Sequence, residues 1–148
     1  MNWPAPQPGL VIRYAYLWQH QALVRQQEGT KDRPCAVVLA ARDDNATERV
    51  YVLPITHAEP RPPQEGMEIP GPVKTRLRLD EERSWIIVTE GNVFTWPGPD
   101  LRPLAGHGPA SVAYGFLPPR FFRVVRDRFV DCARARRAKL TVRDEWTR

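Results

Sequence analysis

Proline interrupts almost every part of this sequence and limits what the chain can fold into. The chain has 16 prolines among its 148 residues, about twice the roughly 5% share that is usual in globular proteins. Because proline lacks a backbone N–H and has a fixed φ angle, it breaks helices and is confined to the first residue, the edges or the bulges of strands. Together with short strand-like segments, this composition predicts a mostly β domain, a small barrel whose bent loops carry the function.

The pattern of apolar residues predicts the individual strands. Residues 34–41 are apolar on both faces, which is typical of a central strand. Residues 73–79 alternate apolar with basic side chains, which predicts a strand with one basic, exposed face. Pro54 within the third strand indicates an edge or a bulge. The expected strands are 9–18, 34–41, 49–58, 67–69, 73–79 and two segments on either side of 90–92.

A single segment near the end of the chain has helical spacing. Apolar side chains at Phe121, Val125, Phe129 and Cys132 form one stripe of a helix predicted over 119–138. The length of the chain predicts one domain. We expect a flexible arm over 1–8, a domain over 9–140 that includes the helix, and a tail over 141–148. The polar stretch 19–33 is predicted to be a long loop.

Charge and cysteine content restrict the partners and the compartment. The net charge of +5 suits a polyanionic partner such as nucleic acid. The chain has neither a run of about 20 apolar residues nor a signal-peptide pattern at its start, so we expect no membrane span and a cytoplasmic location. Cys35 and Cys132 lack metal-ligand spacing and are predicted to be buried thiols in a reducing compartment. No metal and no cofactor are predicted.

Four segments, in their order along the chain, resemble a known family. A glycine opens an apolar strand in "PGLVIRYAYLW"; a polar loop ends in arginine, proline and a second apolar strand in "GTKDRPCAVVL"; a third strand ends in "PITH"; and "IIVTEGNVFTW" carries a carboxylate. This order resembles the PemK/MazF family of bacterial toxins, the ribonuclease halves of type II toxin–antitoxin pairs. The resemblance covers about 8–97 and the final helix. It implies an SH3-like barrel, a homodimer, an acidic antitoxin as partner, and sequence-specific, metal-independent cleavage of single-stranded mRNA.

Four residues in these segments have the chemistry that such cleavage needs. Transfer of the phosphate to the 2′-hydroxyl requires a base for the 2′ proton, donors that hold the phosphorane, and an acid for the leaving 5′ oxygen. Arg33 is suited to grip phosphate oxygens, and Thr56 offers a hydroxyl donor. Glu90 can act as the base if its pKa is raised, and His57 can act as base or acid. Because a short turn joins the second and third strands, their far ends meet and bring Arg33 to Thr56. Arg33, Thr56 and Glu90 are expected at one phosphate, with His57 at its edge.

Further basic residues are expected to hold the flanking RNA. The first long loop lines the RNA groove in the family, and exposed basic residues elsewhere can hold neighbouring phosphates. One departure from the family stands at Val88, where relatives often have a basic residue two positions before the carboxylate. Either another group, such as His57 or a nearby arginine, supplies the acid, or the chain cleaves poorly. The residues predicted to bind RNA are Arg25, Lys31, Arg76 and Arg78.

Two other functions stay open. Small barrels often serve as non-enzymatic modules that bind nucleic acid or peptides, and Val88 favours such a degenerate barrel. CcdB-like gyrase poisons share this barrel by resemblance and use a C-terminal aromatic residue, for which Trp146 is the candidate. They lack the pairing of an arginine-proline strand with "PIT". Arg33 also has a purely structural alternative, which is an ion pair with Asp32.

Overall fold

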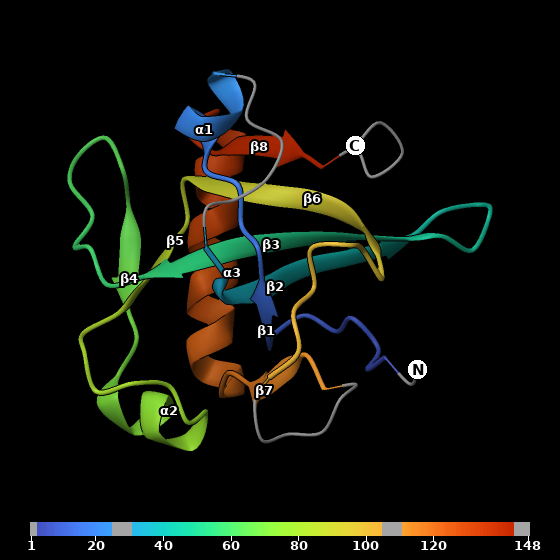
Figure 1. Cartoon of the computed structure of the whole chain (residues 1–148). Helices are drawn as coiled ribbons and strands as arrows, with labels where there is room; N and C mark the ends of the chain where they lie inside the picture. Colours follow the sequence, from blue (N-terminus) through green and yellow to red (C-terminus); the bar gives the residue numbers. More distant parts are fainter. Residues whose placement is uncertain (1–2, 25–30, 105–110, 144–148) are drawn as a thin grey trace.

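The computed structural model describes residues 3–24, 31–104 and 111–143, which form eight strands and three helices (Figure 1). The elements in chain order are β1 (Leu10–Tyr14), α1 (Gln19–Leu23), β2 (Arg33–Arg42), β3 (Glu48–Thr56), β4 (Gly66–Glu68), α2 (Gly71–Arg76), β5 (Trp85–Ile87), β6 (Glu90–Trp96), β7 (Ala113–Phe116), α3 (Pro119–Arg134) and β8 (Lys139–Val142). No helix in these ranges is long and apolar enough to cross a membrane.

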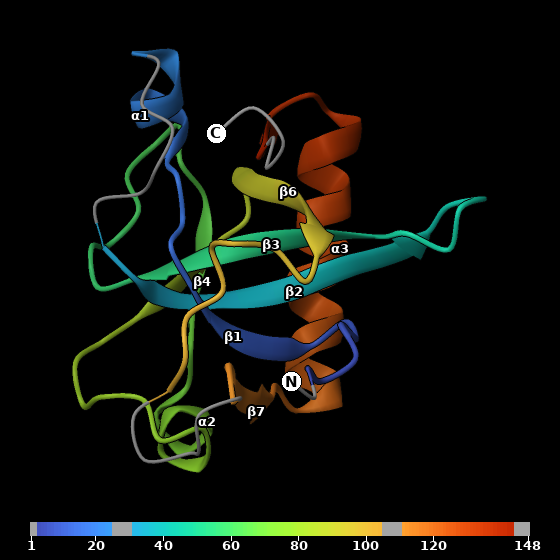
Figure 2. The same cartoon turned by 45° about the vertical axis from the view of Figure 1, so that its right-hand side comes forward.

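The strands form one bent sheet in the order β4-β5-β3-β2-β1-β7, with β6 beside β3 and β8 beside β6 (Figure 2). The pairing of β6 with β8 is parallel, and the other pairs in the described ranges are antiparallel. The prediction of a mostly β fold with a C-terminal helix is confirmed. The end strands β4 and β7 are not paired with each other in the described residues, so these strands do not close a barrel.

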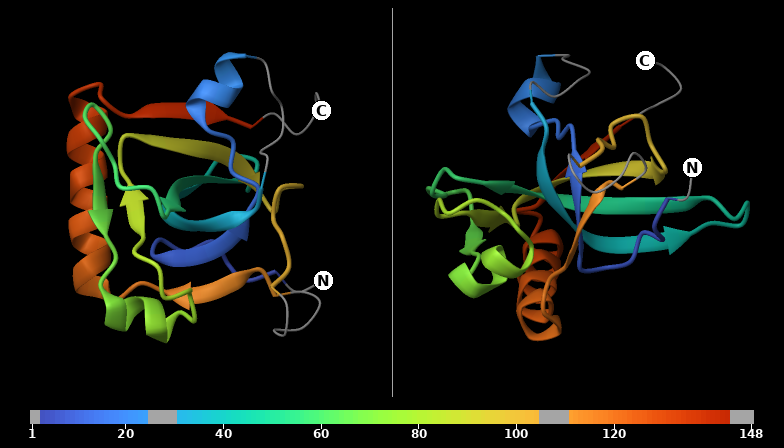
Figure 3. Two further views of the ribbon diagram at one scale, coloured as in Figure 1. Left: turned by 60° about the vertical axis from the view of Figure 1, so that its left-hand side comes forward. Right: turned by 60° about the horizontal axis from the view of Figure 1, so that its bottom comes forward.

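Apolar side chains fill both faces of the sheet. On one face α3 runs across the central strands (Figure 3) and buries Val125, Phe129 and Cys132, as the helical stripe predicts. On the other face a second cluster contains Tyr14 and Phe94, whose rings stack with centroids 4.7 Å apart. Residues 35–38 of β2 are fully buried and contribute alternately to both clusters. The prediction that this segment is a central strand is therefore confirmed.

Pro54 has a different setting from the edge or bulge that the sequence predicts. β3 is central, since β2 lies on one side and both β6 and β5 lie on the other. Along that second side, β6 pairs as far as Val52, and β5 begins to pair at Ile55. Pro54 lies in the gap between the two partner strands, where its missing N–H interrupts no ladder on that side.

The segment 73–79 is not the basic-faced strand that the sequence predicts: residues 73–76 belong to α2, and a turn follows at 77–78. Proline lies at the start of α2, where its fixed φ suits the first helical turn. Val73 and Leu77 are four residues apart and both pack on the core from one helix face. Apolar residues at every second position include pairs that are four positions apart, so the same segment fits both a strand and a helix. Packing against the core decided in favour of the helix.

Four predicted boundaries differ in the described residues. Trp3 packs on the second cluster, so the described part of the predicted arm is anchored to the core at this residue. The predicted loop 19–33 contains the short helix α1. The terminal helix ends at Arg134 rather than at 138. The predicted tail begins within β8, and Arg143 beyond it is only 2% exposed.

Candidate functional site

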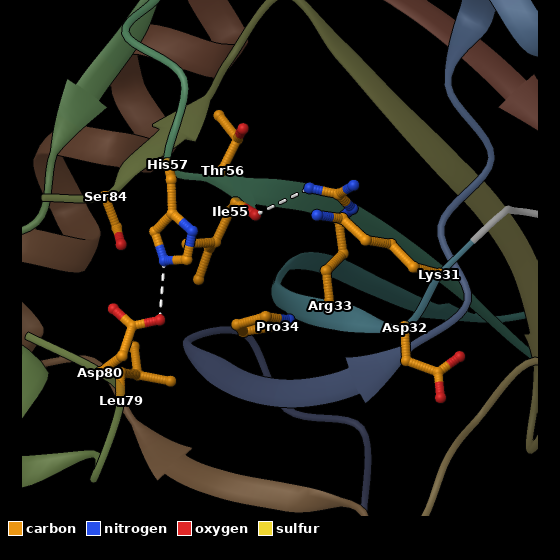
Figure 4. A pocket seen from close by; sticks show the side chains of 10 residues that line it. All are labelled: Lys31, Asp32, Arg33, Pro34, Ile55, Thr56, His57, Leu79, Asp80 and Ser84. Carbon is orange, nitrogen blue, oxygen red and sulfur yellow. Dashed lines mark hydrogen bonds and ion pairs between the residues drawn. The ribbon is translucent and has the colours of Figure 1, made fainter. Parts of the chain in front are cut away.

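The start of β2 and the end of β3 lie together and line one pocket (Figure 4). In the ladder between these strands Cys35 pairs with Pro54, so the antiparallel register puts Arg33 opposite Thr56. β3 ends at Thr56, and His57 follows in a bend. Both residues line the pocket, but their side chains point in opposite directions, with the His57 ring turned toward Asp80 (Figure 4). The pocket holds about 210 Å³. Of the four predicted catalytic residues, the structure brings these three together.

Arg33 is a partly buried cation with few partners. Its NH1 atom donates a long hydrogen bond of 3.4 Å to the Ile55 carbonyl oxygen, and its buried Nε has no partner in the described residues. The Trp18 ring covers the guanidinium at 4.9 Å. Burial lowers the pKa of Arg33 from its ordinary value, although Cys35 and Tyr16 act in the opposite direction. A guanidinium that is partly desolvated and not fully hydrogen-bonded is suited to bind an anion.

The carboxylates that line this pocket are paired with other cations. Asp32 forms ion pairs with Arg13 at 3.7 Å and Arg102 at 3.4 Å. The expected alternative, an ion pair between Arg33 and Asp32, does not occur. In the described ranges no carboxylate forms an ion pair with Arg33. The negative charge at the rim is thus neutralised, and the cation of Arg33 is left for a ligand.

Asp80 orients His57 from across the pocket. The Nε2 atom of His57 lies 2.7 Å from Asp80 Oδ2, and the Nδ1 atom lies 3.4 Å from Glu82 Oε2. Lys74, which is only 5% exposed, donates to Asp80 Oδ1 at 2.8 Å. Partial burial favours the neutral acid, but the hydrogen bonds from Lys74 and His57 prevail and hold the pKa of Asp80 below its ordinary value. An ionised Asp80 therefore fixes the imidazole ring.

The same three side chains are close enough to be considered as metal ligands. The nearest ligand atoms of His57, Asp80 and Glu82 lie within 4.8 Å of one another. However, the two carboxylates contact opposite ring nitrogens, and Asp80 already binds the ammonium group of Lys74. A single ion would take only one of these ring nitrogens, so the contacts present describe an imidazole held between two carboxylates rather than a metal centre.

Thr56 keeps its hydroxyl proton for a ligand. Its Oγ1 atom accepts a hydrogen bond from the Ala58 backbone N–H at 3.1 Å. Because this contact uses an oxygen lone pair, the hydroxyl group can still donate. The pocket thus offers a guanidinium, a hydroxyl donor and an oriented imidazole within one hollow.

Glu90 lies in a second pocket, so the predicted meeting of all four residues at one phosphate is not what the structure shows. Its Oε1 atom accepts hydrogen bonds from the Tyr16 hydroxyl at 2.9 Å and from the Gln19 backbone N–H at 3.0 Å. Burial raises the pKa of Glu90 above its ordinary value, although these two hydrogen bonds oppose the change. The adjacent Gly91 is not in a turn but in β6, where a Cβ atom would come within 2.9 Å of the Val52 carbonyl oxygen.

The residues predicted to bind RNA are dispersed. Lys31 lines the Arg33 pocket. Arg76 ends α2, and Arg78 follows it with a φ of 57°; both are exposed and neither lines that pocket. The predicted site at Arg25 lies outside the described residues, as does Trp146.

Sequence reasoning missed the contributions of Trp18, Asp80 and Lys74. In the sequence Trp18 is part of the alternating apolar face of the first predicted strand, which indicates that it is buried. That pattern does not show that Trp18 contacts Arg33, because a long loop separates the two residues. Asp80 is 23 residues from His57, and no local pattern links the two. Val88 is fully buried in the α3-side core, so the basic residue of the family would not fit there without a change in packing.

No protein-family model matches the chain, and neither a curated protein nor a solved structure matches it.

Proposed function

We propose that the protein is a metal-independent endoribonuclease that cleaves single-stranded RNA, the toxin of a type II toxin–antitoxin pair with an SH3-like fold. The observation that carries this proposal is the partly buried, incompletely bonded guanidinium of Arg33 beside Thr56 and His57. The residues that support the family resemblance, the arginine-proline start of β2 and the threonine end of β3, are the residues that line this pocket. A phosphodiester supplies the anion that such a site requires.

In the proposed reaction Arg33 and Thr56 donate hydrogen bonds to the oxygens of the scissile phosphate. Asp80 holds Nε2 of His57 at 2.7 Å, whereas Nδ1 has only a longer contact of 3.4 Å with the exposed carboxylate of Glu82. In the proposed reaction Nδ1 gives up that contact and exchanges a proton with the substrate. Nδ1 takes the 2′-hydroxyl proton, the 2′ oxygen attacks phosphorus, and the bond to the 5′ oxygen breaks. The 5′ oxygen takes a proton from water. The products are a 2′,3′-cyclic phosphate and a 5′-hydroxyl end.

The proposed partners follow from the family resemblance. A net charge of +5 would steer an acidic antitoxin segment toward this surface, so their association should slow as salt rises. A homodimer is also proposed. The apolar stripe of α3 is covered within one chain, but other apolar side chains stay exposed at or next to α1, β7, α3 and β8, namely Leu23, Val24, Phe116, Val124, Leu140 and Val142. Sedimentation at micromolar concentration that shows only a monomer would refute the dimer.

A binding module without catalysis is the second candidate. Two observations favour it: Glu90 lies outside the Arg33 pocket, and Val88 occupies the position where relatives often have a basic residue. Such a module would bind single-stranded RNA through Arg33 and Lys31 but would leave it intact.

The test is cleavage of a long single-stranded RNA by purified protein in the presence of a metal chelator. Arg33→Ala should lower the rate about 10²–10³-fold, by analogy with loss of a pre-organised donor to a transition state. Thr56→Ala and His57→Ala should also be slower. Arg42→Ala serves as the matched control, because Arg42 is an exposed arginine that pairs with Glu48 in the β2–β3 hairpin, and it should cleave like the unmodified protein.

Two outcomes would overturn the proposal. Equal cleavage by all variants would mean that a contaminant or another site is responsible. Binding of RNA that depends on Arg33, without any cleavage by the unmodified protein, would establish the binding module instead.

A further inference from the structure

A second pocket lies where α1 approaches the starts of β6 and β8. Its volume is about 330 Å³, which is at the small end of the range for ligand sites. Its lining carries both hydrogen-bond donors and acceptors: Gln19, Gln64, Glu90, Arg137 and Lys139. Most of the lining surface is apolar, and these polar groups are few. Such a pocket suits a small planar ligand with apolar faces and a polar edge.

Glu90 is the fixed group in this pocket. Two donors from the preceding segment hold its Oε1 atom, the Tyr16 hydroxyl and the Gln19 N–H. Its Oε2 atom has no bonded donor in the part of the chain that the structure describes. The carboxylate is therefore oriented by the protein and retains acceptor capacity for a ligand.

Cations flank the carboxylate without neutralising it by a direct ion pair in the described ranges. Lys139 is the register partner of Glu90 in the β6–β8 ladder. Arg137 is held at 2.8 Å by Glu65, which lies outside the pocket lining. The pocket thus places donors near an acceptor, which is the arrangement that recognises the edge of a nucleobase.

The two pockets lie on either side of one short segment. Trp18 covers Arg33 of the first pocket, and Gln19, the next residue, lines the second. Because Trp18 and Gln19 are consecutive residues, we infer that a single strand with a phosphate against Arg33 can extend its neighbouring base toward Glu90.

We propose that this second pocket binds a guanine base of the single-stranded RNA, with Oε2 of Glu90 accepting hydrogen bonds from both its N1–H and its 2-amino group. Guanine alone among the four RNA bases presents two adjacent donors on this edge. Adenine and cytosine each place a ring-nitrogen acceptor beside the amino group, and uracil places its single N–H between two carbonyl groups. Gln64, Arg137 and Lys139 can donate to guanine O6. The inference rests on the proposed function, which supplies the RNA.

The first experiment maps the ends of fragments released from a long RNA of mixed sequence. A guanosine should recur at one fixed position relative to the cut. Replacement of that guanosine by inosine, which lacks the 2-amino group, should lower cleavage by the unmodified protein about tenfold, in keeping with the loss of one member of a two-bond contact to a base. Glu90→Gln should remove most of this difference, whereas Glu48→Gln, in the distant hairpin, should keep it.

The second experiment separates this inference from the proposed activity. Fluorescence anisotropy measures the binding of 2′-O-methyl oligonucleotides, which cannot be cleaved, and compares guanine with hypoxanthine at the position found in the first experiment. If the protein cleaves no RNA in the first experiment, each guanine of a test oligonucleotide is replaced by hypoxanthine in turn. A preference for guanine that depends on Glu90, with no cleavage of RNA, would support the base site and refute the nuclease. Cleavage without a guanine preference, or with a preference that Glu90→Gln leaves unchanged, would refute the base site and leave the nuclease standing.

Discussion

Replacement of Arg143 by methionine should strongly destabilise the fold. The guanidinium of Arg143 is 2% exposed and lies 3.0 Å from the buried carboxylate of Asp100. It also donates to the Ala15 carbonyl oxygen at 2.9 Å and to Asn92 Oδ1 at 3.0 Å. Arg143 thus joins the end of β8 to β6, to the segment after β1 and to the loop that contains Asp100.

The magnitude follows from what the substitution leaves behind. Methionine fills similar space with apolar atoms but leaves Asp100 buried without this cation. Removal of one partner from a buried ion pair costs about 3–5 kcal/mol, which is a large share of the roughly 5–15 kcal/mol that stabilises a typical domain. For a domain of this size, the melting temperature should fall by about 6–20 °C.

The assay is equilibrium unfolding in denaturant, followed by circular dichroism. Arg143→Met is compared with Asp100→Leu, with the double variant, and with Arg123→Met on the exposed face of α3, which should change stability by less than about 0.5 kcal/mol. The double variant should lose less than the sum of the single variants, because the contact between the two side chains is lost only once. A loss below about 1 kcal/mol for Arg143→Met would refute the buried pair and restore the reading of 141–148 as a tail.

Three further predictions concern stability and reactivity. Burial raises the pKa of Glu90 above its ordinary 4.5, so the folded state holds this proton more strongly than the unfolded state. The resulting stability is lost as pH rises through the folded-state pKa. Unfolding measured from pH 4 to 7 should show this decline in the unmodified protein and not in Glu90→Gln. Phe129→Ala should cost about 3–5 kcal/mol in denaturant unfolding, since the ring is 2% exposed between α3 and the sheet; a loss under about 1 kcal/mol would mean that α3 does not pack there. Burial raises the pKa of the Cys35 and Cys132 thiols, so a thiol reagent should label neither in the native protein and both after unfolding, and fast native labelling would contradict their burial.

The sequence determined the elements whose signal is local. β2 is apolar on both of its faces, which predicted a central strand. The apolar stripe of Val125, Phe129 and Cys132 predicted that α3 packs on the core. The short connection between β2 and β3 also placed Arg33 near Thr56, because an antiparallel hairpin brings its two open ends together. These predictions succeeded because side-chain period and hairpin geometry are set by neighbouring residues.

Tertiary structure decided the features that depend on contacts between distant segments. The residues 73–79 fit both a strand and a helix, and only packing of Val73 and Leu77 on the core selected the helix. The sequence predicted Glu90 at the same phosphate as Arg33. Its hydrogen bonds to Tyr16 and Gln19, more than 70 residues earlier, hold it in another pocket. No local pattern encodes such pairs, since their partners meet only when the sheet has folded.

The same reason explains the charges of the Arg33 pocket. From the sequence alone, Asp32 was the nearest carboxylate to Arg33 and the natural candidate for its partner. In the fold, Asp32 pairs with Arg13 and Arg102 instead, and Asp80 pairs with Lys74. The sequence by itself thus determined which charged residues stand at the ends of β2 and β3. Which of them remains available to a ligand was decided by tertiary structure, because ion pairing depends on distance in space and not on distance along the chain.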